Sequence, residues 1–309
     1  MKILITGADG MLGSDLQKVL KKDHELILGT IDIFDITDID TTINFIKINK
    51  PDLVIHAAAY TDVDGCESNI DQAYRVNALG ARNIAVGCNY TDAAMVYIST
   101  DYVFDGQKGN SYTEFDATNP LSVYGKSKLE GENFVKRICD RHYIVRTSWL
   151  FGKNGKNFIT TMLKLAEIRD EISVVDDQVG SPTYTLDLAK AISQLIAKPT
   201  YGTFHITNSD YCSWYQFAKE IFEIAGKSKI RVNRISTEEL NRPAPRPKYS
   251  VLNNYCWHLQ GYDKIRSYKE ALREYTQIYR DLLFLRLVKE ILKKILNYQM
   301  TMFYVMQLL

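Results

Sequence analysis

The chain has 309 residues, of which 46% are hydrophobic and 24% charged, so it holds enough apolar sequence for one large domain or two smaller ones. Its 38 lysine and arginine residues balance 37 aspartate and glutamate residues, and this net charge of +1 gives no basic surface for nucleic acid. The five cysteines contain no C-x-x-C pair and no uncharged apolar stretch reaches the ~18 residues of a membrane span, which argues against a disulfide framework, a zinc site and a transmembrane segment.

Short apolar strands alternate with amphipathic helices through the first half of the chain. The expected strands are, in chain order, KILIT (2–6), LILGTI (26–31), DLVIHAA (52–58), AMVYIST (94–100) and YIVRTS (143–148). Helical periodicity lies between them, at residues 12–22, 39–49, 71–90 and 125–139. This alternation predicts an α/β fold with a Rossmann-type, doubly wound parallel sheet.

The rhythm changes after Trp149, where the regular alternation ends. Helices are expected near 185–197 and 213–225, with a strand at GTFHIT (202–207) between them and a Pro-rich segment after them. We therefore predict two domains and a C-terminal extension. The Rossmann domain comprises residues 1–150 and 176–200, a smaller α/β substrate-binding domain comprises 151–175 and 201–278, and the extension comprises 279–309.

The C-terminal extension has an amphipathic pattern. Apolar side chains recur on one face of the expected helix, at Phe284, Leu287, Val288, Ile291, Leu292 and Ile295. The opposite face carries lysine and glutamate. The pattern favours a helix that packs on its own subunit or on a neighbouring one, and attachment to a membrane surface is the alternative.

Three glycines connect the first strand to the first helix. Gly7, Gly10 and Gly13 have G-x-x-G-x-x-G spacing within the segment TGADGMLG. Glycine there permits a tight turn and lets backbone N–H groups and a helix N-terminus approach a pyrophosphate. Because the motif follows a strand and opens a helix, it predicts a dinucleotide site rather than a turn without a ligand.

A tyrosine and a lysine lie four residues apart in YGKSK. Tyr124 and Lys128 therefore share one face of a helix, where an ammonium group favours ionisation of the phenol and the phenol can exchange a proton with a carbonyl or alcohol oxygen. Thr100 ends the fourth expected strand and supplies a hydroxyl at the edge where α/β sheets bind ligands. Alone, the pair favours a surface tyrosine beside a solvated lysine; together with the glycine turn and Thr100 it favours catalysis.

Several blocks occur in the order typical of one enzyme family. They include HAAAYTDVDGCE (56–67), YRVNALGARNIA (74–85), STDYVFDG (99–106), NPLSVYGKSKLEGE (119–132), RTSWLFG (146–152), DDQVGSPTYTLDLA (176–189) and RPKYSVL (246–252). Over about residues 1–275 the chain resembles the dTDP-4-dehydrorhamnose reductase family of extended short-chain dehydrogenases/reductases.

The resemblance implies a role for each matching position. Tyr124 is the general acid, Lys128 tunes its pKa and anchors the ribose, and Thr100 is the third catalytic residue. The cofactor residues implied with the glycine turn are Gly7, Gly10, Met11, Leu12, Gly13, Ala57, Ala58, Ala59, Thr61, Asn77, Ser99, Tyr124 and Lys128. The substrate residues implied are Val63, Thr100, Asp101, Val103, Tyr124 and Trp149. Taken individually, the two valines are also compatible with packing, Asp101 with a cap and Trp149 with a plug at the domain junction.

The chain departs from the family in ways that leave its cofactors open. Met11 stands where glutamine is frequent, and the segment after the second strand lacks a basic residue for a 2′-phosphate, whereas Asp32 or Asp35 can bind a ribose hydroxyl. The cofactor is therefore NADPH or NADH. A Mg²⁺ ion at a dimer interface occurs in part of the family, but no clear ligand set supports one here, and the histidines have no ligand spacing.

The resemblance implies an NAD(P)H-dependent oxidoreductase. The expected reaction is reduction of the C4 keto group of dTDP-6-deoxy-L-lyxo-4-hexulose to dTDP-L-rhamnose. One alternative is a reductase or epimerase of another nucleotide-diphospho-sugar. Another is a non-catalytic regulatory subunit like that of methionine adenosyltransferase. The expected partner is a dTDP-sugar, without nucleic acid, and we expect a cytoplasmic protein that forms a homodimer.

Overall fold

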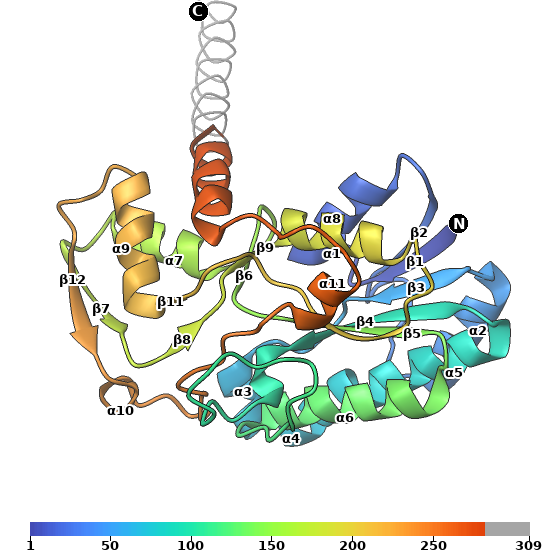
Figure 1. Cartoon of the computed structure of the whole chain (residues 1–309). Helices are drawn as coiled ribbons and strands as arrows, with labels where there is room; N and C mark the ends of the chain where they lie inside the picture. The colour runs from blue at the N-terminus through green and yellow to red at the C-terminus, as the bar shows by residue number, and fades with distance from the viewer. Residues whose placement is uncertain (282–309) are drawn as a thin grey trace, which may run out of the picture.

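The computed structural model describes residues 1–281 (Figure 1). Most of the predicted C-terminal extension, including its whole apolar stripe, lies outside the described residues. Within the described part, no helix combines the length and the apolar character that crossing a bilayer requires.

A six-stranded parallel sheet forms the centre of the larger domain. Its strand order is β10-β5-β4-β3-β1-β2, and every neighbouring pair is parallel. The strands are β1 (Lys2–Thr6), β2 (Glu25–Gly29), β3 (Leu53–His56), β4 (Ala94–Thr100), β5 (His142–Thr147) and β10 (Gly202–His205). The prediction of a Rossmann-type, doubly wound sheet is confirmed.

Helices cover both faces of this sheet (Figure 1). One face packs against α1 (Met11–Leu20) and α8 (Thr185–Leu195), the other against α2 (Ile39–Asn49), α5 (Ala81–Thr91) and α6 (Val123–Ile138). Alternate residues of β1 supply the two cores: Ile3 and Ile5 face α1, whereas Leu4 faces α5. Burial on both faces explains why these strands are continuous apolar runs.

Short elements connect these helices and strands. They are α3 (Val63–Ser68), α4 (Ile70–Tyr74), a π-helix η1 (Arg75–Gly80), a 3₁₀ turn η2 (Asp101–Val103) and α11 (Tyr255–Leu259). The single helix predicted at 71–90 is thus divided into α4, η1 and α5. A π-type turn keeps the same apolar periodicity on both sides, so a sequence pattern does not reveal it.

The smaller domain has short strand pairs packed on helices. Its elements are β6 (Leu150–Phe151), α7 (Phe158–Leu165), β7 (Glu171–Val175), β8 (Val179–Gly180), β9 (Thr183–Tyr184), β11 (Cys212–Ser213), α9 (Trp214–Ile224), β12 (Arg231–Ile235), α10 (Thr237–Leu240) and a helical segment at 268–281. The pairs are β6–β9, β7–β12 and β8–β11. Aromatic side chains such as Phe151, Phe217 and Tyr275 fill its core.

Two strands are placed differently from the predicted domain limits. β10 was assigned to the smaller domain but pairs with β5, from Gly202 with Tyr143 to His205 with Arg146, as an edge of the large sheet. β8 was assigned to the Rossmann domain but pairs with β11 beside α9. An apolar run predicts a buried strand, but only tertiary pairing decides which sheet receives it.

Candidate active site

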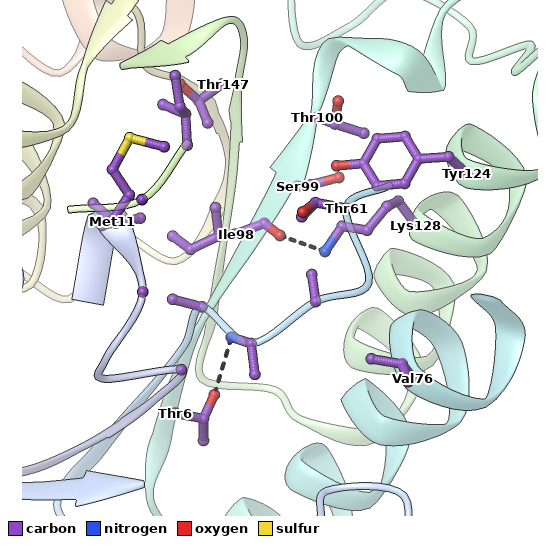
Figure 2. Close-up of a pocket in the computed structure, with 18 of the residues that line it drawn as sticks. Thr6, Met11, Thr61, Val76, Ile98, Ser99, Thr100, Tyr124, Lys128 and Thr147 are labelled. Atoms are coloured by element: carbon purple, nitrogen blue, oxygen red, sulfur yellow. Dashed lines mark hydrogen bonds between the residues drawn. The ribbon is translucent and has the colours of Figure 1, made fainter. Parts of the chain in front are cut away.

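A cavity of about 940 Å³ opens at the carboxyl ends of the large sheet. Its walls come from the β1–α1 turn, the segment after β2, the ends of β3, β4 and β5, the start of α6 and, from the smaller domain, Leu150, Gly155, Lys156 and Trp214. In Figure 2, Met11 lies on one side of this cavity and Thr100, Tyr124 and Lys128 lie together on the other. This edge of an open α/β sheet is where such folds bind ligands.

The predicted glycine turn forms one end of the cavity. Gly7 has a φ of 63°, and a Cβ atom there would lie 2.8 Å from the Ala58 nitrogen, so only glycine fits. Gly10 begins α1 without a side-chain cap, which leaves first-turn N–H groups available to an anion. Gly13 lies behind the turn, where a side chain would clash with Gly7 and Ala8. These features fit the pyrophosphate of a dinucleotide.

The segment after β3 continues the wall from the glycine turn. Four of the predicted cofactor residues line the cavity here: Ala57, Ala58, Ala59 and Thr61. Asn77 does not line the cavity; its Oδ1 accepts a hydrogen bond from the Tyr60 nitrogen at 2.8 Å, and its Nδ2 donates to the Tyr60 oxygen at 3.1 Å. Asn77 therefore holds this segment in place from behind.

The segment after β2 carries Asp32 and Asp35, the two candidates for binding a ribose hydroxyl of the cofactor. The structure places these two carboxylates differently. Asp35 lines the cavity, and its Oδ1 accepts from the Thr37 nitrogen at 2.8 Å. Asp32 is exposed and does not line it. On the opposite wall, Lys156 follows Gly155, where a Cβ atom would lie 3.9 Å from that of Met11. A cationic side chain therefore lies near the glycine turn.

Tyr124 and Thr100 meet where β4 ends. Ser122 caps α6 by accepting a hydrogen bond from the Gly125 nitrogen at 3.1 Å, and this start of the helix sets Tyr124 at the cavity. Burial raises the pKa of the Tyr124 phenol well above its usual range, and the nearby Asp101 carboxylate raises it further, whereas hydrogen bonding with Thr100 lowers it. The phenol is therefore protonated at neutral pH.

Lys128 lies one helical turn beyond Tyr124 and is 2% exposed. Its Nζ donates to the Ile98 oxygen at 2.7 Å and lies 4.1 Å above the centre of the Tyr97 ring (Figure 2). Burial lowers its pKa to about 7, and the Glu132 carboxylate opposes this shift. The sequence predicts an ammonium that assists Tyr124, and the structure shows that keeping this group charged is itself costly.

The resemblance implies substrate contacts for Asp101 and Val103, but both side chains are buried. Asp101 borders the cavity but is only 3% exposed, and both its oxygens have partners: Oδ1 accepts from Thr100 Oγ1 at 3.1 Å and Oδ2 from Ser250 Oγ at 2.5 Å. Burial raises its pKa to about 6. Val103 does not line the cavity and is buried against Phe104. Val63 and Trp149 do line it, as do Leu12 and Ser99.

Two carboxylates of the large domain, Asp64 and Asp101, accept hydrogen bonds from the Pro-rich segment of the smaller domain. Asp64 accepts from Arg242 Nη1 at 2.9 Å and from Arg246 Nη1 at 3.0 Å. Asp101 accepts from Ser250 further along the same segment. The Pro-rich segment is therefore hydrogen-bonded to the large domain at Asp101, directly after Thr100.

Comparisons with known proteins place the chain in one family. The sequence matches the family described as the RmlD substrate binding domain over residues 1–281. This chain belongs to that family. A dTDP-4-dehydrorhamnose reductase of Aggregatibacter actinomycetemcomitans is 41% identical over 82% of this chain and 90% of its own. The spore coat polysaccharide biosynthesis protein SpsK of Bacillus subtilis is 43% identical over 89% of this chain and 97% of its own.

Solved structures of relatives have the same fold. The dTDP-4-dehydrorhamnose reductase of Clostridium acetobutylicum is 50% identical, with a TM-score of 0.89 over 91% of this chain and 100% of that one. The dTDP-4-dehydrorhamnose reductase of Bacillus anthracis, solved in complex with NADP, is 45% identical, with a TM-score of 0.87 over 89% of this chain and 98% of that one. The family therefore includes members that bind a dinucleotide.

Several cavity residues of this family member were not singled out from the sequence. They include Ile98, Tyr102, Thr147, Lys156 and Trp214. Thr147 was detectable, because it ends β5 in register with Thr100. Trp214 gave no signal, because it opens a helix of the other domain and only the packing of the two domains brings it to the cavity.

The described residues contain no group of three or more His, Cys, Asp or Glu side chains that could hold a metal ion. The two fully buried histidines are neutral at pH 7, since burial lowers the pKa of His56 and of His205 to about 3. His56 Nδ1 pairs with Thr6 Oγ1 at 2.7 Å. The burial of both histidines and the His56–Thr6 hydrogen bond indicate that these side chains have a structural role in the fold.

A buried ion pair lies behind α6, the helix that carries Tyr124 and Lys128. Glu132 is fully buried one turn after Lys128, and Arg146 Nη2 donates to its Oε2 at 2.7 Å while Arg146 Nε donates to its Oε1 at 2.9 Å. The Ser99 hydroxyl also donates to this carboxylate, at 2.6 Å. Ser99 was predicted to bind the cofactor, but its hydroxyl is directed at Glu132. The pair joins α6, β4 and β5 under the site.

We expect Glu132→Gln to lower the free energy of unfolding by about 3–5 kcal/mol, because it leaves the Arg146 charge buried without a counter-ion. Chemical denaturation measures this. Glu130→Gln is the matched control on the same helix, since the Glu130–Arg137 pair is largely exposed and should cost only about 0–1 kcal/mol. Equal effects of the two substitutions would contradict the special role of the buried pair.

Proposed function

We propose that this chain reduces the C4 keto group of dTDP-6-deoxy-L-lyxo-4-hexulose to dTDP-L-rhamnose with NADPH or NADH. The observation that carries the proposal is the meeting of Tyr124 and Thr100, one turn from Lys128, in a cavity that begins at the glycine turn. The reductases at 40–50% identity support the substrate class, and the NADP complex of the Bacillus anthracis relative supports the cofactor.

Tyr124 acts as the general acid. When bound, the dinucleotide supplies the hydride. Tyr124 holds its proton at the phenol oxygen at neutral pH, because burial raises its pKa, and releases that proton to the C4 oxygen of the sugar. Thr100 lies beside the phenol; its hydroxyl donates to Asp101 Oδ1 in this structure, and turning that proton to the Tyr124 oxygen stabilises the phenolate that remains.

Lys128 has two tasks in this proposal. Its Nζ already donates to the Ile98 oxygen, and its remaining protons are available to the ribose hydroxyls of the cofactor. Its positive charge also favours release of the Tyr124 proton. Because burial lowers the pKa of Lys128 to about 7, the Glu132 carboxylate is needed to keep that charge.

The remaining roles follow the position of each residue along the cavity. The proposed cofactor residues are Gly7, Gly10, Met11, Leu12, Asp35, Ala57, Ala58, Ala59, Thr61 and Ser99. Gly13 and Asn77 support them from behind. Val63, Asp101 and Trp149 are the proposed substrate residues, and Val103 contributes by packing.

The test uses the purified full-length chain, the 4-keto sugar nucleotide and NADPH or NADH. We expect loss of the reduced-nicotinamide absorbance to depend on the sugar nucleotide, and the product to be dTDP-L-rhamnose by proton NMR. Omitting the sugar nucleotide is the control for unproductive oxidation. Cofactor binding without any turnover of nucleotide sugars would instead support the alternative of a regulatory subunit.

One relative favours a second candidate within the same chemistry. The dTDP-4-keto-6-deoxy-D-glucose reductase of Streptomyces niveus is 37% identical over 88% of this chain and 95% of its own. Both enzymes reduce a 4-keto group, so Tyr124 serves either substrate. Supplying dTDP-4-keto-6-deoxy-D-glucose without an epimerase separates them: efficient turnover would assign the second activity.

The proposal extends to the state of the protein in the cell. Five free cysteines and a balanced charge support the cytoplasm as its location. The family resemblance supports a homodimer, which sedimentation of the full-length chain tests directly.

A further inference from the structure

Two indole rings stack at the wall of the cavity that faces the smaller domain. Trp149 and Trp214 have ring centres 3.4 Å apart and planes that differ by 7°. Trp149 lies on the link between β5 and β6, and Trp214 is the first residue of α9. Both line the cavity, although they come from elements more than sixty residues apart in the sequence. The two domains thus meet at this aromatic pair.

The pair is held rigidly from both sides. Trp149 packs on Gly180, where a Cβ atom would lie 2.5 Å from the indole ring, and Phe158 packs on Trp214 with ring centres 4.5 Å apart. Ser213 caps α9 directly before Trp214 in a capping box with Gln216. A rigid aromatic surface binds ligands without a large loss of side-chain freedom.

Trp149 adopts a backbone conformation that is unfavourable for its residue type. Its φ is 48°, in the left-handed region, where a bulky residue is strained. Such strain is typically retained at ligand sites, where the surrounding structure holds the residue in place. Here that conformation brings the indole of Trp149 against Trp214 rather than into the core.

The indole N–H groups give a second observation. Trp257, the third tryptophan, is 1% exposed, and its Nε1 donates to the Asp263 oxygen at 2.8 Å. Among residues 1–281, no acceptor lies within hydrogen-bonding distance of Nε1 of Trp149 or Trp214, and neither nitrogen is sealed from solvent. Because the rings cover each other and Gly180 and Phe158 pack on them from outside, the pair offers a ligand its apolar indole edges and two donors.

The position of the Trp149–Trp214 pair in the cavity indicates which of the two reactants it contacts. Trp149 follows Thr147 by two residues, and Thr147 pairs in register with Thr100, so the pair lies next to the reacting centre. The glycine turn, where the dinucleotide enters, belongs entirely to the large domain. The smaller domain also brings Gly155 and Lys156 close to Met11, so the part of its surface left for the other reactant is the Trp149–Trp214 pair, whose indole edges contact apolar sugar and base atoms.

We propose that Trp214, through its stack with Trp149, is a binding residue for the nucleotide-diphospho-sugar and not for the dinucleotide. The proposal rests on the proposed function, since it assigns one residue of that site to one of its two ligands. It also explains why the cavity is incomplete without the smaller domain.

The test compares Trp214→Ala with Tyr215→Ala by calorimetric titration of dTDP-L-rhamnose and, separately, of NADPH. Tyr215 is the next residue of α9 but does not line the cavity, so it is the matched control. We expect Trp214→Ala to weaken dTDP-L-rhamnose binding by about 5- to 100-fold and to leave NADPH binding within about twofold. Tyr215→Ala should change neither. Unchanged NADPH affinity also shows that the variant is folded.

A spectroscopic measurement gives an independent check, because the chain has three tryptophans. Adding dTDP-L-rhamnose should change the indole emission of the wild type and of Trp257→Phe, and this change should be smaller in Trp214→Phe, which keeps only the Trp149 indole at the cavity. If Trp214→Ala binds dTDP-L-rhamnose like the wild type, or loses NADPH affinity instead, the proposal is wrong while the proposed function stands. If the wild type does not bind dTDP-L-rhamnose, both are wrong.

Discussion

Replacing Tyr124 by phenylalanine should lower kcat for reduction by about 10²–10⁴-fold, because it removes only the proton that the C4 oxygen must receive. The ring itself stays, so its edge-on contact with Tyr102 at 5.7 Å is kept and the start of α6 is undisturbed. The dissociation constant of NADPH should therefore change by less than about threefold. Steady-state kinetics with the 4-keto sugar nucleotide and a fluorescence titration of NADPH measure the two quantities.

Tyr102→Phe is the control for the loss of a phenol oxygen at the same cavity. Tyr102 also lines the cavity, but its phenol lies beside Arg246 rather than beside Thr100. We expect at most about a tenfold loss of kcat in this variant. A Tyr124→Phe enzyme that turns over like the wild type would exclude Tyr124 as the acid.

Lys128→Met should abolish turnover and weaken NADPH binding, yet raise the melting temperature. Turnover and NADPH binding should fall because, among the lysines of α6, Lys128 is the one that is buried and lines the cavity beside Tyr124. The third effect follows because a buried ammonium is costly: its pKa is lowered from 10.5 to about 7 by burial. Methionine fills a similar volume without a charge.

The gain in stability should depend on pH in a fixed direction. Since the folded-state pKa of Lys128 is about 7 and the unfolded value is 10.5, the unfolded chain binds more protons between these limits, and wild-type stability rises with pH there. The advantage of Lys128→Met should thus be largest at about pH 6 and smaller at about pH 9. Lys126→Met, at an exposed position of the same helix, should show no such trend. A pH-independent difference would contradict the buried charge.

The sequence predicts the large sheet because each strand is an apolar run between helical patterns, and burial on both faces requires that composition. It also predicts Gly7, Tyr124 and Lys128, since backbone space and helical spacing are local properties. Predicting where they lie needs only the strand ends and the start of α6, whereas the pKa values of Tyr124 and Lys128 depend on burial and on tertiary partners.

Other features depend on tertiary contacts that a pattern does not contain. Asp101 stays a proposed substrate residue, but no pattern reveals that its two oxygens accept from Thr100 and from Ser250 of the other domain. Ser99 lines the cavity and stays a proposed cofactor residue, but its sequence position does not reveal that its hydroxyl donates to Glu132 on α6. In each case the residue type predicts a polar side chain that needs a hydrogen-bond partner, but the sequence does not show which residue that partner is.

The attachment of the Pro-rich segment at Asp64 and Asp101 has a consequence for engineering this chain. Surface connections usually tolerate insertions, because few buried groups depend on their exact path. Residues 241–252 form such a connection by their lack of regular structure, but Ser250 is 1% exposed and hydrogen-bonded to the neighbour of Thr100. An affinity tag or a fused domain inserted there would therefore disturb the Ser250–Asp101 hydrogen bond beside Thr100, the proposed catalytic threonine. The exposed loop at 198–201, which carries no such bond to the site, is the better insertion point.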